Sequence, residues 1–289
     1  MKFTVPGKTF LVGEYSVLMG GSALGLATKP YFEIDYTNQV ISHYHAESPA
    51  GMYLAKYKSE AQANLTDPYL TGGFGKSTAE YFSVIIPELL KSKIHFSDIL
   101  KEYRDLHTTH KVKPSGIDLC FQYFGNVTLA DPVIQFYQSF DWHFENLDFY
   151  IISTGLKIDT HEHLKSLNLD NLKDLPKLSD KITRVYAENR EFEFLALMKE
   201  WCELLSKHGL THSNSLEIKQ QIEVFDAVKL AKPCGALGAD VMIVFFAKTQ
   251  KEAVKIFLDE NKFKIQAHSS DLAEGVLFQL QKHWSPNVG

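Results

Sequence analysis

Residues 71–80, Thr-Gly-Gly-Phe-Gly-Lys-Ser-Thr-Ala-Glu, are the most informative stretch of this 289-residue chain. Its three glycines allow unusual backbone angles, and the residues that follow, 81–86, are typical of a helix. A glycine-rich turn before a helix can present backbone N–H groups to phosphate oxygens, and the Ser77 hydroxyl can bind Mg²⁺. The stretch predicts a phosphate-binding loop, with a plain surface turn as the alternative.

This loop is not the nucleotide-binding loop known as Walker A, although Gly75-Lys76-Ser77 resembles its end. Walker A requires a glycine five residues before Gly75, and this chain has Leu70 there. A phosphate site at this point therefore has to belong to another class of protein.

Composition excludes several classes of function. With 30 Lys and Arg against 35 Asp and Glu, the net charge is −5, which disfavours binding to nucleic acid or to an anionic membrane. The hydrophobic content of 45% is that of a globular protein, and no stretch is long and apolar enough for a signal peptide or a membrane span. The three cysteines form no CxxC pair, so we expect neither a zinc ribbon nor a disulfide framework, and a cytoplasmic location.

The two halves of the chain differ in their pattern, and we expect domains at residues 1–146 and 147–289. The first half alternates short strands with glycine-rich turns and a few helices; its clearest strands are 10–12, 31–36 and 127–129. The second half predicts a strand, long helices, a strand, a helix and a strand, at 147–153, about 160–232, 241–246, about 249–260 and 262–267. Overall the class is α+β, and the second half suggests a split βαβ sandwich.

Three further segments carry polar and glycine residues in a characteristic order. They are Pro6-Gly7-Lys8-Thr9-Phe10-Leu11-Val12-Gly13-Glu14-Tyr15 near the start, Lys113-Pro114-Ser115-Gly116-Ile117-Asp118 in the middle, and Lys232-Pro233-Cys234-Gly235-Ala236-Leu237-Gly238-Ala239-Asp240 near the end. Together with the loop at 71–80, they resemble the three signature motifs of the GHMP kinases, the superfamily of galactokinase and of homoserine, mevalonate and phosphomevalonate kinases. Each motif alone is weak evidence, but their order along the whole chain is specific.

The resemblance implies an N-terminal ribosomal-protein-like α/β domain that binds ATP with Mg²⁺, and a C-terminal ferredoxin-like domain. It implies that Asp118 is the catalytic base and that Lys8 lies beside it. An ammonium beside a carboxylate keeps the carboxylate ionised, so that it can accept the proton of an alcohol. The resemblance further implies a phosphate loop of Gly73, Gly75, Lys76, Ser77 and Thr78, with Ser77 as metal ligand, and substrate contacts from Glu14, Ser115, Gly116, Thr160, Gly235, Ala236 and Gly238.

The chain departs from the family pattern at points that bear on the metal site. His107 occupies the position at which mevalonate kinases carry a Mg²⁺-binding glutamate, and a neutral imidazole is a poor ligand for Mg²⁺. Glu80, Glu102 or Asp105 could supply the carboxylate instead, or Ser77, Asp118 and nucleotide oxygens could suffice. Lys76 either contacts a phosphate or points to solvent.

The acceptor is left open between mevalonate, favoured by Asp118, and 5-phosphomevalonate, favoured by Tyr15 and by the Asp240 ending. A substrate phosphate would require cations such as Arg104, Lys111 or Lys113. The alternative of another class is a catalytically silent relative that only binds a nucleotide or metabolite, and Asp118 would then merely cap a helix. We expect a small-molecule hydroxy acid or phospho acid as partner; a homodimer is compatible with the sequence.

Overall fold

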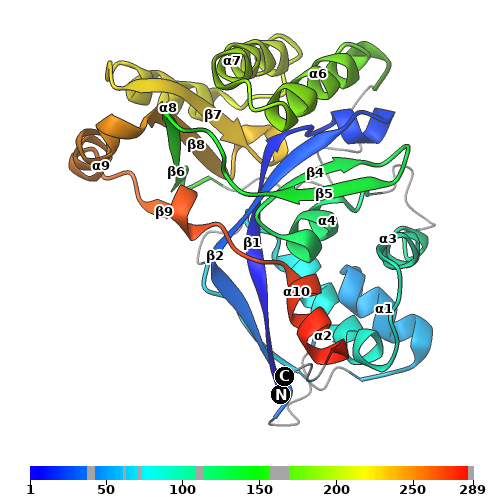
Figure 1. Ribbon diagram of the computed structural model, residues 1–289. Coiled ribbons are helices and arrows are strands. Elements are labelled where there is room, and N and C mark those ends of the chain that lie inside the picture. Colours follow the sequence, from blue (N-terminus) through cyan, green and yellow to red (C-terminus); the bar gives the residue numbers. More distant parts are fainter. Residues whose placement is uncertain (38–42, 61–62, 70–72, 108–113, 157–168, 286–289) are drawn as a thin grey trace.

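A computed structural model describes residues 1–37, 43–60, 63–69, 73–107, 114–156 and 169–285. In these ranges the chain forms two antiparallel sheets with helices around them (Figure 1). The first sheet is built from residues of the first half, and the second sheet from residues that follow Asn146. The α+β class expected from the sequence is confirmed.

The first sheet has the strand order β1-β2-β4-β5, with the short β3 paired to the far end of β2. The longest part of this sheet is the hairpin of β1 and β2, which pair from Lys2 opposite Asp35 to Val12 opposite Leu24. The bounds are β1 Lys2–Val12, β2 Ala23–Asp35, β3 Asn64–Thr66, β4 Val127–Asp131 and β5 Phe136–Phe140. The helices of this half are α1 Pro49–Tyr57, α2 Lys76–Lys91, α3 Phe96–Asp105 and α4 Ile117–Phe124.

The second sheet has the strand order β7-β8-β6-β9, which is the order of a ferredoxin-like sheet. Alternate residues of β6 enter two different hydrophobic clusters, so both faces of the sheet are covered. The bounds are β6 Leu147–Ser153, β7 Val228–Cys234, β8 Val241–Ala247 and β9 Ile265–His268. The helices are α6 Leu175–Ala187, α7 Glu191–Lys207, α8 Ser213–Glu223, α9 Lys251–Glu260 and α10 Val276–Trp284.

The structure corrects the sequence-based expectation in this half at one point. Residues 228–234 form the strand β7, whereas the pattern predicts helices up to about residue 232. Two of the helices in that region, α6 and α7, are separated by a short turn, because α6 ends at Ala187 and α7 begins at Glu191. The predicted strand at 241–246 is confirmed as β8, and its first six residues are all buried.

Close packing against a glycine places α4 on the first sheet. A side chain at Gly25 of β2 would overlap the ring of Phe121, so the missing side chain lets α4 approach the strand. The Phe121 ring also meets Phe10 of β1 edge-on, with 4.9 Å between ring centroids. These contacts fix the first turn of α4, which carries Asp118, above β1.

The last helix returns to the first half of the molecule. In Figure 1, α10 lies beside α4 and α2, and Gln279 of α10 exchanges two hydrogen bonds with the backbone of Thr4 in β1. The division into domains at 146 and 147 stays a prediction. No helix in the described ranges has the length and apolar character needed to cross a membrane.

Candidate active site

A cleft of about 160 Å³ brings three of the four sequence segments together. The first segment contributes Lys8, Phe10, Glu14 and Tyr15. The turn before α4 contributes Pro114, Ser115 and Gly116, and the first turn of α4 contributes Asp118. The third motif contributes Gly235, Ala236 and Asp240. Three apolar or aromatic side chains, Val17, Leu18 and Tyr103, complete the lining. The cleft thus contains both residues expected to be catalytic.

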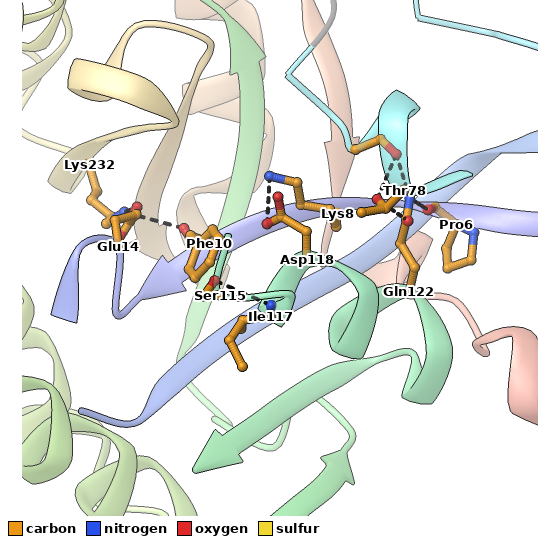
Figure 2. A network of polar contacts seen from close by, with 11 residues as sticks. Pro6, Lys8, Phe10, Glu14, Thr78, Ser115, Ile117, Asp118, Gln122 and Lys232 are labelled. Atoms are coloured by element: carbon orange, nitrogen blue, oxygen red, sulfur yellow. Dashed lines mark hydrogen bonds and ion pairs between the residues drawn. The ribbon is translucent and has the colours of Figure 1, made fainter. Parts of the chain in front are cut away.

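Lys8 and Asp118 form an ion pair in this cleft, with 3.0 Å between Nζ and Oδ1 (Figure 2). The Lys8 side chain is 12% exposed and that of Asp118 is 38% exposed, so the carboxylate is the more accessible partner. Burial by itself lowers the pKa of Lys8, but Asp118, Asp240 and Glu14 outweigh it and the pKa is raised. Lys8 is therefore a permanent ammonium group next to the carboxylate.

The turn before α4 is held from both sides. The guanidinium of Arg104 donates from Nε and Nη2 to the Ser115 carbonyl oxygen, at 2.9 and 2.6 Å. Gly116 has φ of 71°, which favours glycine, and the Ile117 N–H donates to the Ser115 hydroxyl at 3.3 Å. Arg104 was weighed as a cation for a substrate phosphate; in the structure, two of its donors position this turn. Lys111 and Lys113 lie outside the described residues.

The glycine loop leads directly into α2. Gly75 is its N-cap residue with φ of 85°, and the Lys8 N–H donates to the Phe74 carbonyl oxygen at 2.9 Å, which ties the loop to β1. Ser77 is exposed in the first turn of α2, where the free N–H groups and the positive end of the helix dipole lie. This geometry suits an anion. Thr71 and Gly72 lie outside the described residues.

Two residues of the predicted phosphate loop have their side chains engaged elsewhere. Thr78 is buried, and its hydroxyl lies within hydrogen-bond distance of the Gly75 carbonyl oxygen, at 2.9 Å, and of Gln122 Oε1, at 2.5 Å. Gln122 continues the network by donating to the Pro6 carbonyl oxygen at 2.9 Å (Figure 2). The Lys76 ammonium pairs with Asp67 at 3.3 Å and is half exposed. Thr78 therefore connects the loop to α4 and β1.

The third motif supplies a carboxylate that the sequence marked only as a motif ending. A Cβ on Gly73 would lie 2.6 Å from the Cβ of Asp240, and a Cβ on Gly235 would lie 2.7 Å from its Cγ. The Asp240 side chain thus occupies the space that these two glycines leave open, between the glycine loop and the cleft. Gly238 lies against Pro233 and lines a small neighbouring cavity, not the cleft itself.

A buried ion pair joins the first motif to the third. The Lys232 ammonium, which is fully buried, donates to Glu14 Oε1 and to the Phe10 carbonyl oxygen at 3.2 Å (Figure 2). The pKa of Lys232 is raised, because the neighbouring Cys234 and Glu14 outweigh the opposing effect of burial. Tyr15 adds a second link, since its hydroxyl accepts from the Leu237 N–H at 2.9 Å. Burial raises the pKa of Tyr15 to about 12.

The alternative metal ligands lie away from the cleft lining. His107 is 1% exposed and its Nδ1 contacts the Tyr103 carbonyl oxygen at 2.9 Å. Glu102 contacts Lys56 at 2.9 Å and accepts from the Tyr57 hydroxyl at 3.0 Å, while Asp105 lies in a separate groove along α3. Glu80 lies in α2 and is not part of the cleft lining, and burial raises the pKa of its carboxyl group. Within the described ranges, no three His, Cys, Asp or Glu side chains are grouped to hold a metal ion.

The structural positions of Lys232 and Asp240 were not predicted from the sequence. Both residues belong to the third motif, but no sequence pattern near them indicates that Lys232 pairs with Glu14 or that Asp240 packs against Gly73 of the glycine loop. Thr160, expected near the substrate, lies outside the described residues. The remaining candidate residues lie at the glycine loop, for Gly73 and Gly75, or line the cleft, for Ser115, Gly116, Gly235 and Ala236. Their roles in binding stay predictions.

Comparison with known proteins identifies the fold. No family sequence model matches the chain, and no curated protein sequence matches it. Among solved structures, Streptococcus pneumoniae phosphomevalonate kinase, in complex with phosphomevalonate and AMPPNP, superposes with a TM-score of 0.71 at 13% identity, over 93% of this chain and 99% of that chain.

Kinases of other acceptors superpose similarly. Methanococcus jannaschii mevalonate kinase gives a TM-score of 0.64 at 15% identity, over 93% of this chain and 97% of that chain. Lactococcus lactis galactokinase complexed with galactose gives 0.70 at 10% identity, over 95% and 94%. At these identities the likeness concerns the fold and leaves the acceptor open. The chain therefore has the fold of the GHMP kinases, as its motifs predict.

Proposed function

We propose that this protein is an ATP-dependent kinase that transfers the γ-phosphoryl group to the hydroxyl of a small hydroxy acid, mevalonate, in the route to isoprenoids. The observation that carries the proposal is the Lys8–Asp118 ion pair in the cleft, since Lys8 also packs against Gly75 of the glycine loop and its N–H donates to the Phe74 carbonyl oxygen. A carboxylate held by an ammonium group at 3.0 Å, with more than a third of its surface accessible, can orient an alcohol and accept its proton.

The phosphate loop fits ATP because it combines glycine backbone with a helix N-terminus. Gly73 and Gly75 both have φ of 85°, and the first turn of α2 follows directly. In the proposed step, the acceptor oxygen forms a bond to the γ-phosphorus, the bond from that phosphorus to the β–γ bridging oxygen breaks, and ADP leaves. Asp118 takes the hydroxyl proton, and Lys8 holds the Asp118 carboxylate in place at 3.0 Å.

The residues present also fit Mg²⁺, which prefers oxygen ligands and usually binds one or two carboxylates together with nucleotide phosphates. The exposed Ser77 lies in the first turn of α2, and the Asp118 and Asp240 side chains line the cleft. We propose Ser77 as a ligand. When bound, the ion would neutralise charge that develops on the transferring phosphoryl group.

A second acceptor, 5-phosphomevalonate, is favoured by one observation: Asp240, the residue that resembles the phosphomevalonate kinase ending, lies in the cleft lining. Against it, the cleft lining in the described ranges contains one cationic side chain, Lys8, and this side chain pairs with Asp118. A substrate phosphate would therefore depend on Lys111 or Lys113. We keep mevalonate as the first proposal.

The test is a coupled ADP-release assay with Mg·ATP, in which mevalonate, 5-phosphomevalonate, galactose and homoserine are offered separately. We expect turnover with mevalonate. Turnover with 5-phosphomevalonate alone would transfer the assignment to the second acceptor, and turnover with galactose or homoserine alone would refute the mevalonate route. If ATP raises the melting temperature but no acceptor gives ADP, the silent nucleotide-binding alternative is favoured.

A further inference from the structure

The position of Asp240 between the phosphate loop and the cleft has a consequence for the metal ion. Its side chain fills the space left by two glycines, Gly73 of the phosphate loop and Gly235 of the third motif. Any side chain at Gly73 would meet the Asp240 Cβ at 2.6 Å. Both glycines also have positive φ, of 85° and 91°. The carboxylate is thus held against the backbone that we propose to bind phosphate.

A cation beside Asp240 would favour the binding of a nucleotide at this position. Asp240 lies close enough to Lys8 to raise its pKa, but the ammonium of Lys8 is 3.0 Å from Asp118. The described cleft lining contains three carboxylates, of which Asp118 pairs with Lys8 and Glu14 pairs with the buried Lys232 behind the cleft; Asp240 is the third. A polyphosphate placed beside Asp240 would be repelled unless a cation lay between the two.

The Glu14 carboxylate of the cleft already has a strong partner. Glu14 is 8% exposed and accepts from the fully buried Lys232. Of the carboxylates that the sequence offered as ligands, Glu102 lies beside Lys56 and Asp105 lies in the groove along α3. Glu80 lies in α2, three residues after Ser77, and is not part of the cleft lining. Asp240 differs from Glu80, Glu102 and Asp105 in that it packs against Gly73 of the glycine loop and also lines the cleft that contains Asp118.

We propose that Asp240 is the carboxylate ligand of the Mg²⁺ that accompanies ATP, in place of the glutamate whose position is taken by His107. This inference rests on the proposed binding of ATP. Mg²⁺ takes oxygen ligands, and Asp240 would supply a carboxylate oxygen while Ser77 supplies a hydroxyl and the nucleotide supplies phosphate oxygens. Asp118 then stays free of the metal and keeps its role toward the acceptor.

The test measures nucleotide binding with and without metal, and needs no acceptor. AMPPNP is titrated into wild type, Asp240→Asn and the matched control Asp105→Asn, once with Mg²⁺ and once with EDTA. We expect Asp240→Asn to weaken Mg·AMPPNP binding by about tenfold or more. Binding of metal-free AMPPNP should stay equal or become tighter, because a negative charge beside the phosphates is removed. Asp105→Asn should match wild type in both titrations.

A change of metal preference supplies the second readout. In Asp240→Cys, a thiolate replaces the carboxylate, and thiolates favour Cd²⁺ over Mg²⁺. We expect Cd²⁺ to restore AMPPNP binding in Asp240→Cys but not in Asp240→Asn. Binding of Mn²⁺ in the presence of AMPPNP, followed by its electron paramagnetic resonance signal, should be lost in Asp240→Asn.

Three outcomes would overturn the inference. The first is Mn²⁺ and AMPPNP binding in Asp240→Asn equal to wild type. The second is an equal loss of binding with Mg²⁺ and with EDTA, which would indicate that Asp240 only supports the loop. The third is failure of wild type itself to bind AMPPNP under any condition; that result alone would also refute the proposed function.

Discussion

At the scale of single residues, the chemistry depends on charges that the fold brings into contact. Lys8 comes from β1 and Asp118 from the first turn of α4, and neither strand nor helix alone explains their pairing. Phe121 packed over Gly25 and Arg104 bonded to the Ser115 carbonyl place α4 so that the pair forms. The Asp118 carboxylate is thereby positioned through its helix, which the Phe121 ring holds against β2, and through the preceding turn, which Arg104 holds at Ser115.

Replacing Asp118 by Asn should separate catalysis from nucleotide binding. The amide keeps the shape of the carboxylate but cannot accept the proton of an alcohol, so we expect kcat to fall by roughly 10²–10⁴-fold. The affinity for Mg·AMPPNP should stay within a few-fold of wild type, and Asp105→Asn serves as the control. Unchanged turnover in Asp118→Asn would refute its assignment as the base.

The buried Lys232–Glu14 pair should contribute to stability chiefly because each charge is costly without the other. Lys232→Met leaves Glu14 buried with its cation removed, and we expect a loss of about 3–5 kcal/mol in the free energy of unfolding. In the double variant Lys232→Met with Glu14→Gln, no uncompensated charge is left. Urea denaturation should therefore find the double variant more stable than Lys232→Met, and a double variant that is less stable would contradict this account.

At the scale of elements, the start of α2 depends on glycine for two separate reasons. Gly75 has φ of 85°, and a Cβ there would lie 2.7 Å from Lys8 Cγ and 2.9 Å from Gln122 Nε2. The first reason is backbone strain, and the second is overlap with residues of the site. Gly209, in the connection between α7 and α8, has φ of 69° but no atom within 4 Å of its Cβ position. It offers a matched control.

We predict that Gly75→Ala loses AMPPNP binding while Gly209→Ala retains it. Both substitutions should lower stability by about 1–2 kcal/mol, because alanine is strained at positive φ. Only Gly75→Ala should also displace Lys8 and the phosphate loop. Equal nucleotide affinity in the two variants, measured by calorimetry together with thermal melting, would show that contact at Gly75 does not matter for binding.

Two neighbouring strands of the second sheet, β8 and β7, differ in how clearly the sequence predicts them. The run Val241 to Phe246 is apolar at every position, and burial on both faces of β8 follows from that pattern. In β7, Lys232 and Pro233 obscure the strand, since a buried lysine and a proline are both unusual in a sheet interior. Lys232 is tolerated there because its ammonium pairs with the carboxylate of Glu14, in the turn that follows β1.

At the scale of the whole molecule, the two sheets meet along the cleft through contacts between the first and third motifs. The Lys232–Glu14 pair and the hydrogen bond from the Leu237 N–H to Tyr15 connect β1 and its following turn to β7 and its following turn. Ser22 and Asp180 extend the contact, since the Ser22 N–H and hydroxyl both donate to Asp180 at 2.8 and 2.7 Å. Residues of both halves thereby form a single site.

The three cysteines should be unreactive in the folded protein. Cys120, Cys202 and Cys234 are all buried and reduced, and burial raises the pKa of each thiol, to about 12 for Cys202 and about 11 for Cys234. Since the thiolate is the reactive form, a thiol reagent at about pH 8 should modify none of them in the native state. All three should react in guanidinium chloride. Fast modification of the native protein would contradict the burial.

The same thiols predict that stability falls at alkaline pH. Unfolded cysteines ionise near pH 9.0, whereas folded Cys234 keeps its proton up to about pH 11, so above pH 9 the unfolded chain binds fewer protons than the folded chain. The free energy of unfolding therefore decreases as pH rises through this window, by roughly 1.4 kcal/mol per pH unit for each such thiol. Urea midpoints from pH 8 to 10.5 should show the decrease, and Cys234→Ala should reduce its slope.

The sequence by itself determined the α+β class, the four segments of the candidate site and the superfamily they resemble. Those features are local: glycines at turns, an aspartate at the start of a helix, an apolar run in a strand. Only the tertiary structure decided that Asp240 lies against Gly73, that Thr78 bonds Gln122 and that Lys232 meets Glu14. These contacts join residues far apart in the chain, and they depend on strand register and helix packing, which no local pattern encodes.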